Sequence, residues 1–180
     1  MKYFSIVIFL VIIVGAAFMA ERFYQKNCQP SVTHGMAVVY PTKGNTASGV
    51  VEFWQQDDGV RITATIEGLT PGKHGFHVHE FGNCACDDAI CAGGHYNPTG
   101  AQHGGPDDTN RHVGDFGNLV ANEQGIAKYD HVDTYVKLNG PYSVIGRAVI
   151  IHADPDDLVS QPTGNAGARV GCGVIGIAKA

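Results

Sequence analysis

Short runs of alternating apolar and polar residues dominate the chain from Thr33 onward, and turn residues separate them. In Val60–Glu67 every second side chain is apolar, which is the period of a strand with one buried face. We expect strands at Gly35–Tyr40, Ser48–Gln55, Val60–Glu67, Gly75–Glu80, Val113–Ala121, Ile126–Asp133, Ser143–His152 and Val170–Ala178. Eight short strands without a helical period predict an all-β protein, an antiparallel sandwich or barrel.

Two long stretches interrupt this pattern. Phe81–Arg111 and Ala153–Arg169 are rich in Gly, Asp and Pro and show almost no periodicity. Long irregular loops in a compact domain usually have a functional role. We therefore expect the chemistry of the protein in these two loops.

The N-terminus has a different pattern. Only Ser5 and Gly15 interrupt an apolar run from Tyr3 to Ala20, and Lys2 precedes it. This composition predicts a secretory signal peptide or an N-terminal membrane anchor over residues 1–20. Residues 21–32 are then a linker and residues 33–180 the folded domain. Both alternatives send the domain out of the reducing cytosol, as a secreted, periplasmic or membrane-anchored extracytoplasmic protein attached through residues 3–20.

Composition narrows the class of protein further. The 180 residues are 44% apolar and 16% charged, which suits one domain with a real core and excludes intrinsic disorder. A formal net charge of −5 argues against a nucleic-acid partner. Five Cys in an oxidising compartment favour disulfides.

Nine His are many for a chain of this size. His77 and His79 are two residues apart in a predicted strand, so both imidazoles project from the same face. Val78 between them points the opposite way, toward the core. His152 ends another predicted strand, at the entry to a loop, and is a candidate to complete the shell of the first pair. Several imidazole nitrogens in a tetragonal arrangement suit Cu²⁺.

A second group of candidate ligands falls in the first long loop and just after it. The group consists of His95, His103, His112 and Asp115. Three His and one Asp close a tetrahedral shell, which is the preference of Zn²⁺ at a structural site. The residue types therefore indicate a protein with two metal ions.

At this point the sequence resembles the copper/zinc superoxide dismutase family, from about Thr33 to Ala180. The motifs that carry the resemblance are GFHVHEFG (Gly75–Gly82), AGGHYNP (Ala92–Pro98), HGGP (His103–Pro106), RHVGDFGN (Arg111–Asn118), GRAVIIHADPDDL (Gly146–Leu158) and GNAGARVGCGVIG (Gly164–Gly176). The resemblance implies an eight-stranded antiparallel Greek-key barrel or sandwich, immunoglobulin-like, with two long functional loops.

The resemblance also implies roles for single residues. His77, His79, His95 and His152 would bind one copper ion per subunit. His95, His103, His112 and Asp115 would bind one zinc ion per subunit, so that His95 bridges the two metals. Asp156 matches a carboxylate that would orient one histidine of the copper site and one of the zinc site, through the ring N–H that does not face the metal. Arg169 matches the arginine beside the copper, where it would hold the superoxide anion.

The implied activity is disproportionation of superoxide to O₂ and H₂O₂. Copper would be reduced and reoxidised in turn, Arg169 and His95 would be the catalytic residues, and the His-bridged zinc would be structural. A dismutase-like fold that binds copper and zinc without turnover is the alternative. A dinuclear zinc hydrolase is a third class, disfavoured because the ligands close the zinc shell.

Some features stay open at the level of sequence. By the resemblance, Cys172 is the C-terminal partner of a disulfide, and Cys84 falls where bacterial-type members of the family carry the other half. Cys86 and Cys91 are alternative partners, or pair with each other. Monomer and homodimer both occur among look-alikes, and Cys28 in the linker has no assigned partner.

Overall fold

The computed structural model describes residues 14–22, 24 and 31–179. The chain divides into two units, Met1–Ser31 and Val32–Ala180. In the first unit, residues 14–22 are helical. Among the described residues, no helix has both the length and the apolar character needed to cross a membrane. Residues 1–13 of the predicted signal or anchor lie outside the described residues.

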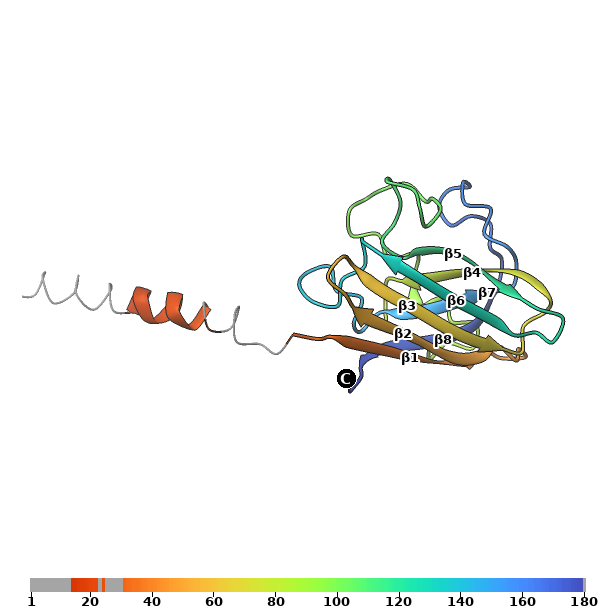
Figure 1. The fold of residues 1–180 in the computed structure, drawn as a ribbon, viewed down its shortest axis with the longest axis horizontal. Coiled ribbons are helices and arrows are strands. Elements are labelled where there is room, and N and C mark those ends of the chain that lie inside the picture. The colour runs from red at the N-terminus through yellow and green to blue at the C-terminus, as the bar shows by residue number, and fades with distance from the viewer. Residues whose placement is uncertain (1–13, 23, 25–30, 180) are drawn as a thin grey trace, which may run out of the picture. The chain divides into compact units, whose positions relative to one another are not determined.

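The second unit is built from eight strands and one short helical turn (Figure 1). The strands are β1 (His34–Pro41), β2 (Ser48–Gln55), β3 (Val60–Glu67), β4 (Gly72–His79), β5 (Asp115–Ala121), β6 (Ala127–Asp133), β7 (Ala148–His152) and β8 (Arg169–Ile177). The 3₁₀ turn η1 (Ile90–Ala92) lies between β4 and β5. All pairs are antiparallel, so the predicted all-β class and strand number are confirmed.

The strands close into a barrel in the order β1-β2-β3-β6-β5-β4-β7-β8. The neighbours β3 and β6, and β4 and β7, are not consecutive in the chain, which is the crossover pattern of a Greek key. Closure by the pairing of β1 with β8 leaves no open edge in this sheet. The predicted alternation holds in β3, where Val60, Ile62, Ala64 and Ile66 are buried in the barrel core.

The start of a strand differs from the sequence prediction by three or more residues in two places, and the other limits differ by at most two residues. The expected strand at Ser143–His152 begins only at Ala148. Gly146 has a φ of 83°, and the N–H of Arg147 donates to the carbonyl of Val144 at 3.0 Å, so a turn occupies the first half. Conversely, β4 begins at Gly72, three residues earlier than expected, because its start pairs with β5.

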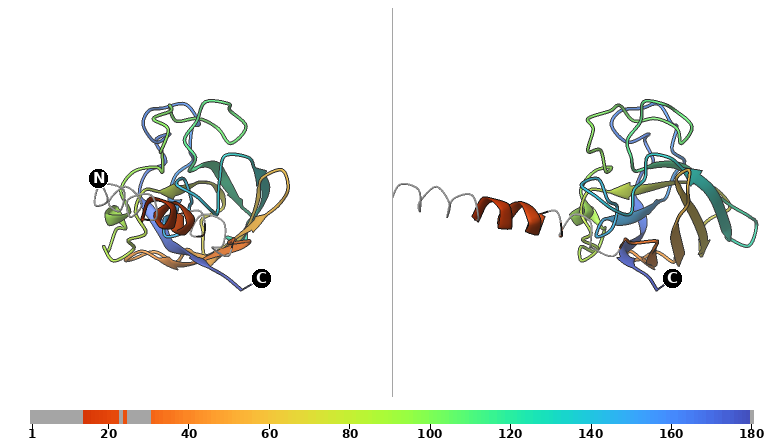
Figure 2. Two further views of the ribbon diagram at one scale, coloured as in Figure 1. Left: turned by 90° about the vertical axis from the view of Figure 1, so that its left-hand side faces the viewer. Right: turned by 60° about the vertical axis from the view of Figure 1, so that its left-hand side comes forward.

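The two long loops lie together on one side of the barrel. Figures 1 and 2 show the green segment near residue 105 beside the blue segment near residue 160 in each view. Gln161 joins them through two hydrogen bonds: the His103 N–H donates to Gln161 Oε1 at 2.8 Å, and Gln161 Nε2 donates to the His103 carbonyl at 2.9 Å. The loops therefore fold as one layer over the outer face of the barrel.

Candidate metal centre

Two groups of potential metal ligands meet in this layer. The first is His77, His79, His95 and His152, and the second is His95, His103, His112 and Asp115. Within each group the ligand atoms lie within 4.8 Å of one another, and every member is buried. His95 belongs to both groups, so the structure joins two pockets at one imidazole.

Strand pairing brings the first group together. His77 and His79 project from the end of β4, and β4 pairs with β7, where Phe76 lies opposite Ile151. His152 is the next residue of β7, so the barrel register sets it beside the two strand histidines. His95 arrives from the loop and makes an isolated β-bridge with His79. The Nε2 atoms of His79 and His152 are 3.4 Å apart.

The second group is assembled around Asp115, the first residue of β5. Asp115 Oδ1 lies 2.7 Å from His95 Nδ1 and 3.1 Å from His112 Nδ1. Asp115 Oδ2 lies 3.1 Å from His103 Nδ1. A tetrahedron with zinc–ligand bonds of 2.0–2.1 Å has edges of about 3.3 Å, so these spacings are close to those of a tetrahedral shell.

Three buried ring nitrogens test whether metal ions fit these groups. His77 Nδ1 and His95 Nε2 have no hydrogen-bond partner, and His103 Nδ1 has none apart from its ion-pair contact with Asp115 Oδ2, itself a member of the second group. On each of these rings the other nitrogen contacts a carboxylate, at Asp156 or at Asp115. An unpartnered buried polar atom is costly unless something binds it. Metal ions in the two pockets would satisfy all three nitrogens, so the residues fit.

Asp156 lies behind both groups and connects them. Its Oδ2 contacts Nε2 of His77 at 2.8 Å and its Oδ1 contacts Nε2 of His103 at 2.9 Å, with all three side chains fully buried. Asn118 holds the backbone of Asp156 on both sides: Oδ1 accepts its N–H at 2.8 Å, and Nδ2 donates to its carbonyl at 2.9 Å. The carboxylate is therefore fixed and orients one imidazole of each group.

Burial favours the neutral form of the imidazoles in the first group. It lowers the pKa of His152 to about 3 and that of His95 to about 4. It also lowers the pKa of His79 well below its usual value, and the neighbouring His95 and His152 lower it further. A metal ion binds the deprotonated nitrogen of a neutral imidazole, so these rings are ready to act as ligands at neutral pH.

The carboxylates dominate at the second group. Burial alone would lower the pKa of His103, but Asp115 and Asp156 outweigh it and raise that pKa to about 9. Burial alone would raise the pKa of Asp115, and contacts with His103, His112 and His95 hold it far below its usual value instead. Without a metal ion this pocket therefore keeps a proton on His103.

Arg169 begins β8, opposite His152 in the ladder between β7 and β8. Its Nη1 donates to the carbonyl of Ala89 and its Nη2 to the carbonyl of Gly93, each at 2.6 Å. The same Gly93 carbonyl contacts Nδ1 of His79 at 2.9 Å. Arg169 thus shares a hydrogen-bond acceptor with a member of the first group.

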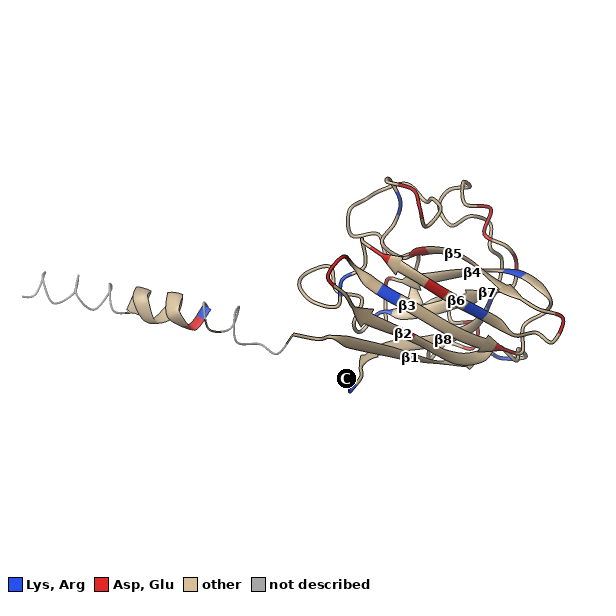
Figure 3. Cartoon of the chain, viewed as in Figure 1, with Lys and Arg blue, Asp and Glu red and all other residues tan. Residues whose placement is uncertain are grey.

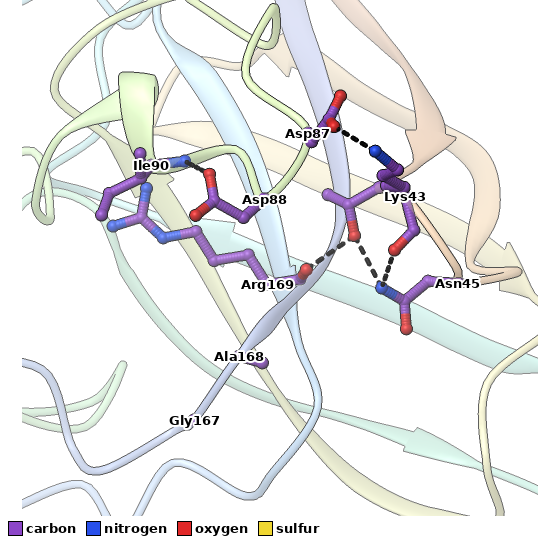
Figure 4. Close-up of a pocket in the computed structure, with 9 residues that line it drawn as sticks. Lys43, Asn45, Asp87, Asp88, Ile90, Gly167, Ala168 and Arg169 are labelled. Atoms are coloured by element: carbon purple, nitrogen blue, oxygen red, sulfur yellow. Dashed lines mark hydrogen bonds and ion pairs between the residues drawn. The ribbon is translucent and has the colours of Figure 1, made fainter.

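An open pocket of about 460 Å³ lies beside Arg169. Figure 4 shows the arginine side chain running past Asp88 and Ile90, with Lys43 and Asp87 on the other side. Lys43 pairs with Asp87 at 2.7 Å, and both are exposed. Arg169 and Lys43 thus place positive charge on the wall of this pocket, and Asp87 and Asp88 place negative charge there.

Two disulfides join the described cysteines. Cys84 bonds to Cys172 of β8, and Cys86 bonds to Cys91. The sequence left the partner of Cys172 open among Cys84, Cys86 and Cys91. The structure has Cys84 in that role, and it pairs Cys86 with Cys91. Cys28 lies outside the described residues. The disulfides indicate an oxidising environment.

Sequence reasoning missed the residues that hold the ligands in place. Asn118 and Gln161 received no role, although Asn118 fixes Asp156 and Gln161 joins the two loops. Arg111 donates to Asp133 at 2.6 Å in a buried ion pair that ties the end of the first long loop, just before His112, to the end of β6. Polar residues of these types are mostly exposed in proteins, so no sequence signal separated these three from solvated neighbours.

Comparisons with known proteins agree with this geometry. The sequence model of a family described as copper/zinc superoxide dismutase (SODC) matches residues 47–175. A crystal structure of the clock protein EA4 is similar to this chain, with 43% sequence identity and a TM-score of 0.77. The alignment covers 83% of this chain and 98% of that one.

Proposed function

The chain belongs to the copper/zinc superoxide dismutase family, and from that membership we propose that it disproportionates superoxide. Two superoxide anions and two protons give one O₂ and one H₂O₂. The observation that carries the proposal is the pair of buried ligand groups joined at His95, with the unpartnered ring nitrogens His77 Nδ1 and His95 Nε2 turned to them. Histidines of a solvated loop, or core histidines with all their hydrogen bonds satisfied, would not need to form two such groups.

In this proposal each group holds its own ion. His77, His79, His95 and His152 hold copper, because four imidazoles suit its tetragonal preference. His95, His103, His112 and Asp115 hold zinc, because three nitrogens and one carboxylate suit a closed tetrahedral shell. When bound, copper would supply the one-electron chemistry, whereas zinc would not change its valence.

The residues of this chain bind the substrate and control the proton. Arg169 stays charged at all working pH values, and its donors suit a small anion. The carbonyls of Ala89 and Gly93 accept one N–H each from Nη1 and Nη2, which leaves the remaining donors for superoxide. His95 Nε2 is buried and without a partner, so it is the atom at which the chain would hold a proton for the product.

Asp156 has a positioning role. Its two oxygens contact Nε2 of His77 and of His103, so the opposite nitrogen of each ring faces its ligand group. The zinc group and the copper group are thereby oriented by one carboxylate. We therefore expect that loss of one metal would disturb the ligands of the other, because both groups contact the same carboxylate.

The proposal includes the setting of the protein. Residues 1–20 would direct the domain from residue 33 onward to an extracytoplasmic location, by cleavage of a signal or by an anchor. A homodimer remains part of the proposal and sedimentation of the purified protein would test it. No nucleic-acid partner is proposed, given the acidic net charge.

The decisive experiment measures metal content and superoxide turnover on the same purified protein. We expect one copper and one zinc per chain, a visible d–d band and rapid turnover. Full loading without turnover would favour the alternative, a copper- and zinc-binding module. Two zinc ions with no visible band would contradict the copper assignment itself.

Arg169→Ile separates substrate binding from metal binding. The variant should retain both metals, because Arg169 contacts none of the proposed ligand atoms directly, but lose about 90% or more of its turnover. Metal analysis and a superoxide assay at saturating copper check this. Unchanged turnover would remove Arg169 from the mechanism.

A further inference from the structure

The position of Arg169 depends on a short segment of the first long loop. Both of its hydrogen-bond acceptors are backbone carbonyls, at Ala89 and at Gly93, on either side of η1. The Gly93 carbonyl is also tied to His79. The Ala89 carbonyl is therefore the contact whose position the metal ligands do not already set.

Ala89 has an unusual conformation for its residue type. Its φ of 57° is in the left-handed region, which an alanine rarely adopts because its Cβ approaches the following carbonyl. The residue is fully buried, and its N–H donates to the carbonyl of Cys86 at 2.9 Å. Its own carbonyl also accepts the N–H of Ala92 at 3.1 Å. Something must hold this backbone against its preference.

The Cys86–Cys91 disulfide encloses Ala89. It closes a ring of residues 86–91, with the two Cα atoms 5.7 Å apart. The other disulfide attaches the loop to β8 at Cys84, outside the ring. Asp87, Asp88 and Ile90 of the ring are exposed and line the pocket beside Arg169 (Figure 4). Two hydrogen bonds add to the restraint: the Lys43 N–H donates to the Asp87 carbonyl at 2.9 Å, and the Ile90 N–H donates to Asp88 Oδ1 at 3.0 Å. The disulfide is the covalent restraint on this ring.

We propose that the Cys86–Cys91 disulfide is a positioning device for Arg169: it holds the Ala89 carbonyl and so keeps the guanidinium in place beside His79, where a small anion at the first ligand group would meet it. The inference rests on the proposed function for its biological meaning. It goes beyond that function because it gives the Cys86–Cys91 bond a role of its own, separate from that of the Cys84–Cys172 bond. That role is to raise the affinity of the site for anions. Metal binding does not depend on it.

The test replaces both cysteines in the full, metal-loaded protein. Cys86→Ser/Cys91→Ser should keep both metals and the Cys84–Cys172 bond, checked by metal analysis and non-reducing peptide mapping. Azide serves as the small anionic probe, titrated by its visible absorption on the copper form. We expect its dissociation constant to rise by about tenfold, and kcat/KM for superoxide to fall by a similar factor.

A double-mutant cycle identifies the route of the effect. In an Arg169→Gln background, removing the disulfide should change azide affinity by less than about twofold, since the group that it positions is gone. Ile62→Val, in the barrel core, is the control for general destabilisation and should leave azide affinity unchanged. The azide titration needs no turnover, so it tests the positioning even if the protein proves not to be a dismutase.

Three results would overturn the proposal. Azide affinity in the cysteine variant equal to that of the parent would show that Arg169 needs no such support. An equal loss in the Arg169→Gln background would show that the disulfide acts through another group. Failure of the cysteine variant to load its metals would assign the disulfide to folding of the site.

Discussion

Gly164 lies against the carboxylate that connects the two ligand groups. A Cβ at this position would be 1.8 Å from Asp156 Oδ1 and 2.6 Å from His103 Nε2. Its φ of 67° is also in the left-handed region. Both facts require glycine here, so the close approach of this loop to Asp156 depends on the absence of a side chain.

Gly164→Ala should therefore weaken the zinc group. The added methyl must displace Asp156 or the His103 ring, and loss of such a supporting contact lowers metal affinity by about 10–100-fold. Competition with a chromophoric zinc chelator measures this. Gly140→Ala is a matched control, because Gly140 has a φ of 83° but open space around its Cβ position. Equal affinities in the two variants would contradict the steric argument.

His103 gives the zinc group a defined pH dependence. Its raised pKa, about 9, keeps the metal-free imidazole protonated at neutral pH. Zinc must displace the proton at Nδ1, so its affinity should rise by about tenfold per pH unit from this ring alone, from pH 6 to 8, and level off near pH 9. Chelator competition across this range, with calorimetry in two buffers to count released protons, checks it. A flat profile would count against it.

At the scale of elements, the loop between β4 and β5 is tied to β8 by a covalent bond. Cys84 joins Cys172 across a separation of 88 residues. Beneath the bond lies a small buried cluster, separate from the barrel core, that includes Ala89, Ala92 and Ile150. Arg169, the first residue of β8, donates into the same loop. The cross-link therefore keeps the arginine strand and the loop that supports it in one unit.

Cys84→Ser/Cys172→Ser should lower the free energy of unfolding by about 4–5 kcal/mol in the chain-entropy account of a loop this long. Denaturant unfolding of the metal-free protein measures the change without interference from metal affinity. The Cys86→Ser/Cys91→Ser variant is the comparison, since its ring has a separation of only 5 residues and should contribute less. A larger loss in the small-ring variant would be inconsistent with this account.

At the scale of the whole molecule, charge works against the proposed substrate. The formal net charge is −5, and superoxide is an anion. In the view of Figure 3, acidic and basic residues are interspersed over β3 and β6, where Arg61 pairs with Asp130. In the pocket itself Asp87 and Asp88 oppose Lys43 and Arg169. The local field is therefore weaker than a single arginine would provide, and we expect a weak dependence of rate on ionic strength.

Asp88→Asn should raise the rate constant by about twofold at low ionic strength, because it removes a negative charge beside Arg169. Asparagine keeps the oxygen that accepts the Ile90 N–H at 3.0 Å, so the ring should not change shape. Asp57→Asn is the control, because it makes the same change in net charge far from Arg169. Asp57 lies near Thr33, just before β1 begins, whereas Lys43 follows the end of β1. A gain shared by both variants, or one that persists in high salt, would refute local steering.

Much of the fold was readable from the sequence because its signals are local. The period of two in Val60–Glu67 identifies a strand whatever its partner, and the same period puts His77 and His79 on one face. The strand at Ser143–His152 was overextended because the turn at Gly146 falls inside an apolar run. The ligand groups are formed by the residues that the motifs single out.

The sequence by itself determined the strand class, the family motifs and the residue types able to hold two metals. Only the tertiary structure decided which cysteines pair, that Asn118 and Gln161 hold the loops, and that the carbonyls of Ala89 and Gly93 support Arg169. Because every residue carries a backbone carbonyl, the residue types do not show which carbonyls have a structural role. Closure of the barrel selects among them, because it brings β8 and the loop after β4 to the same place.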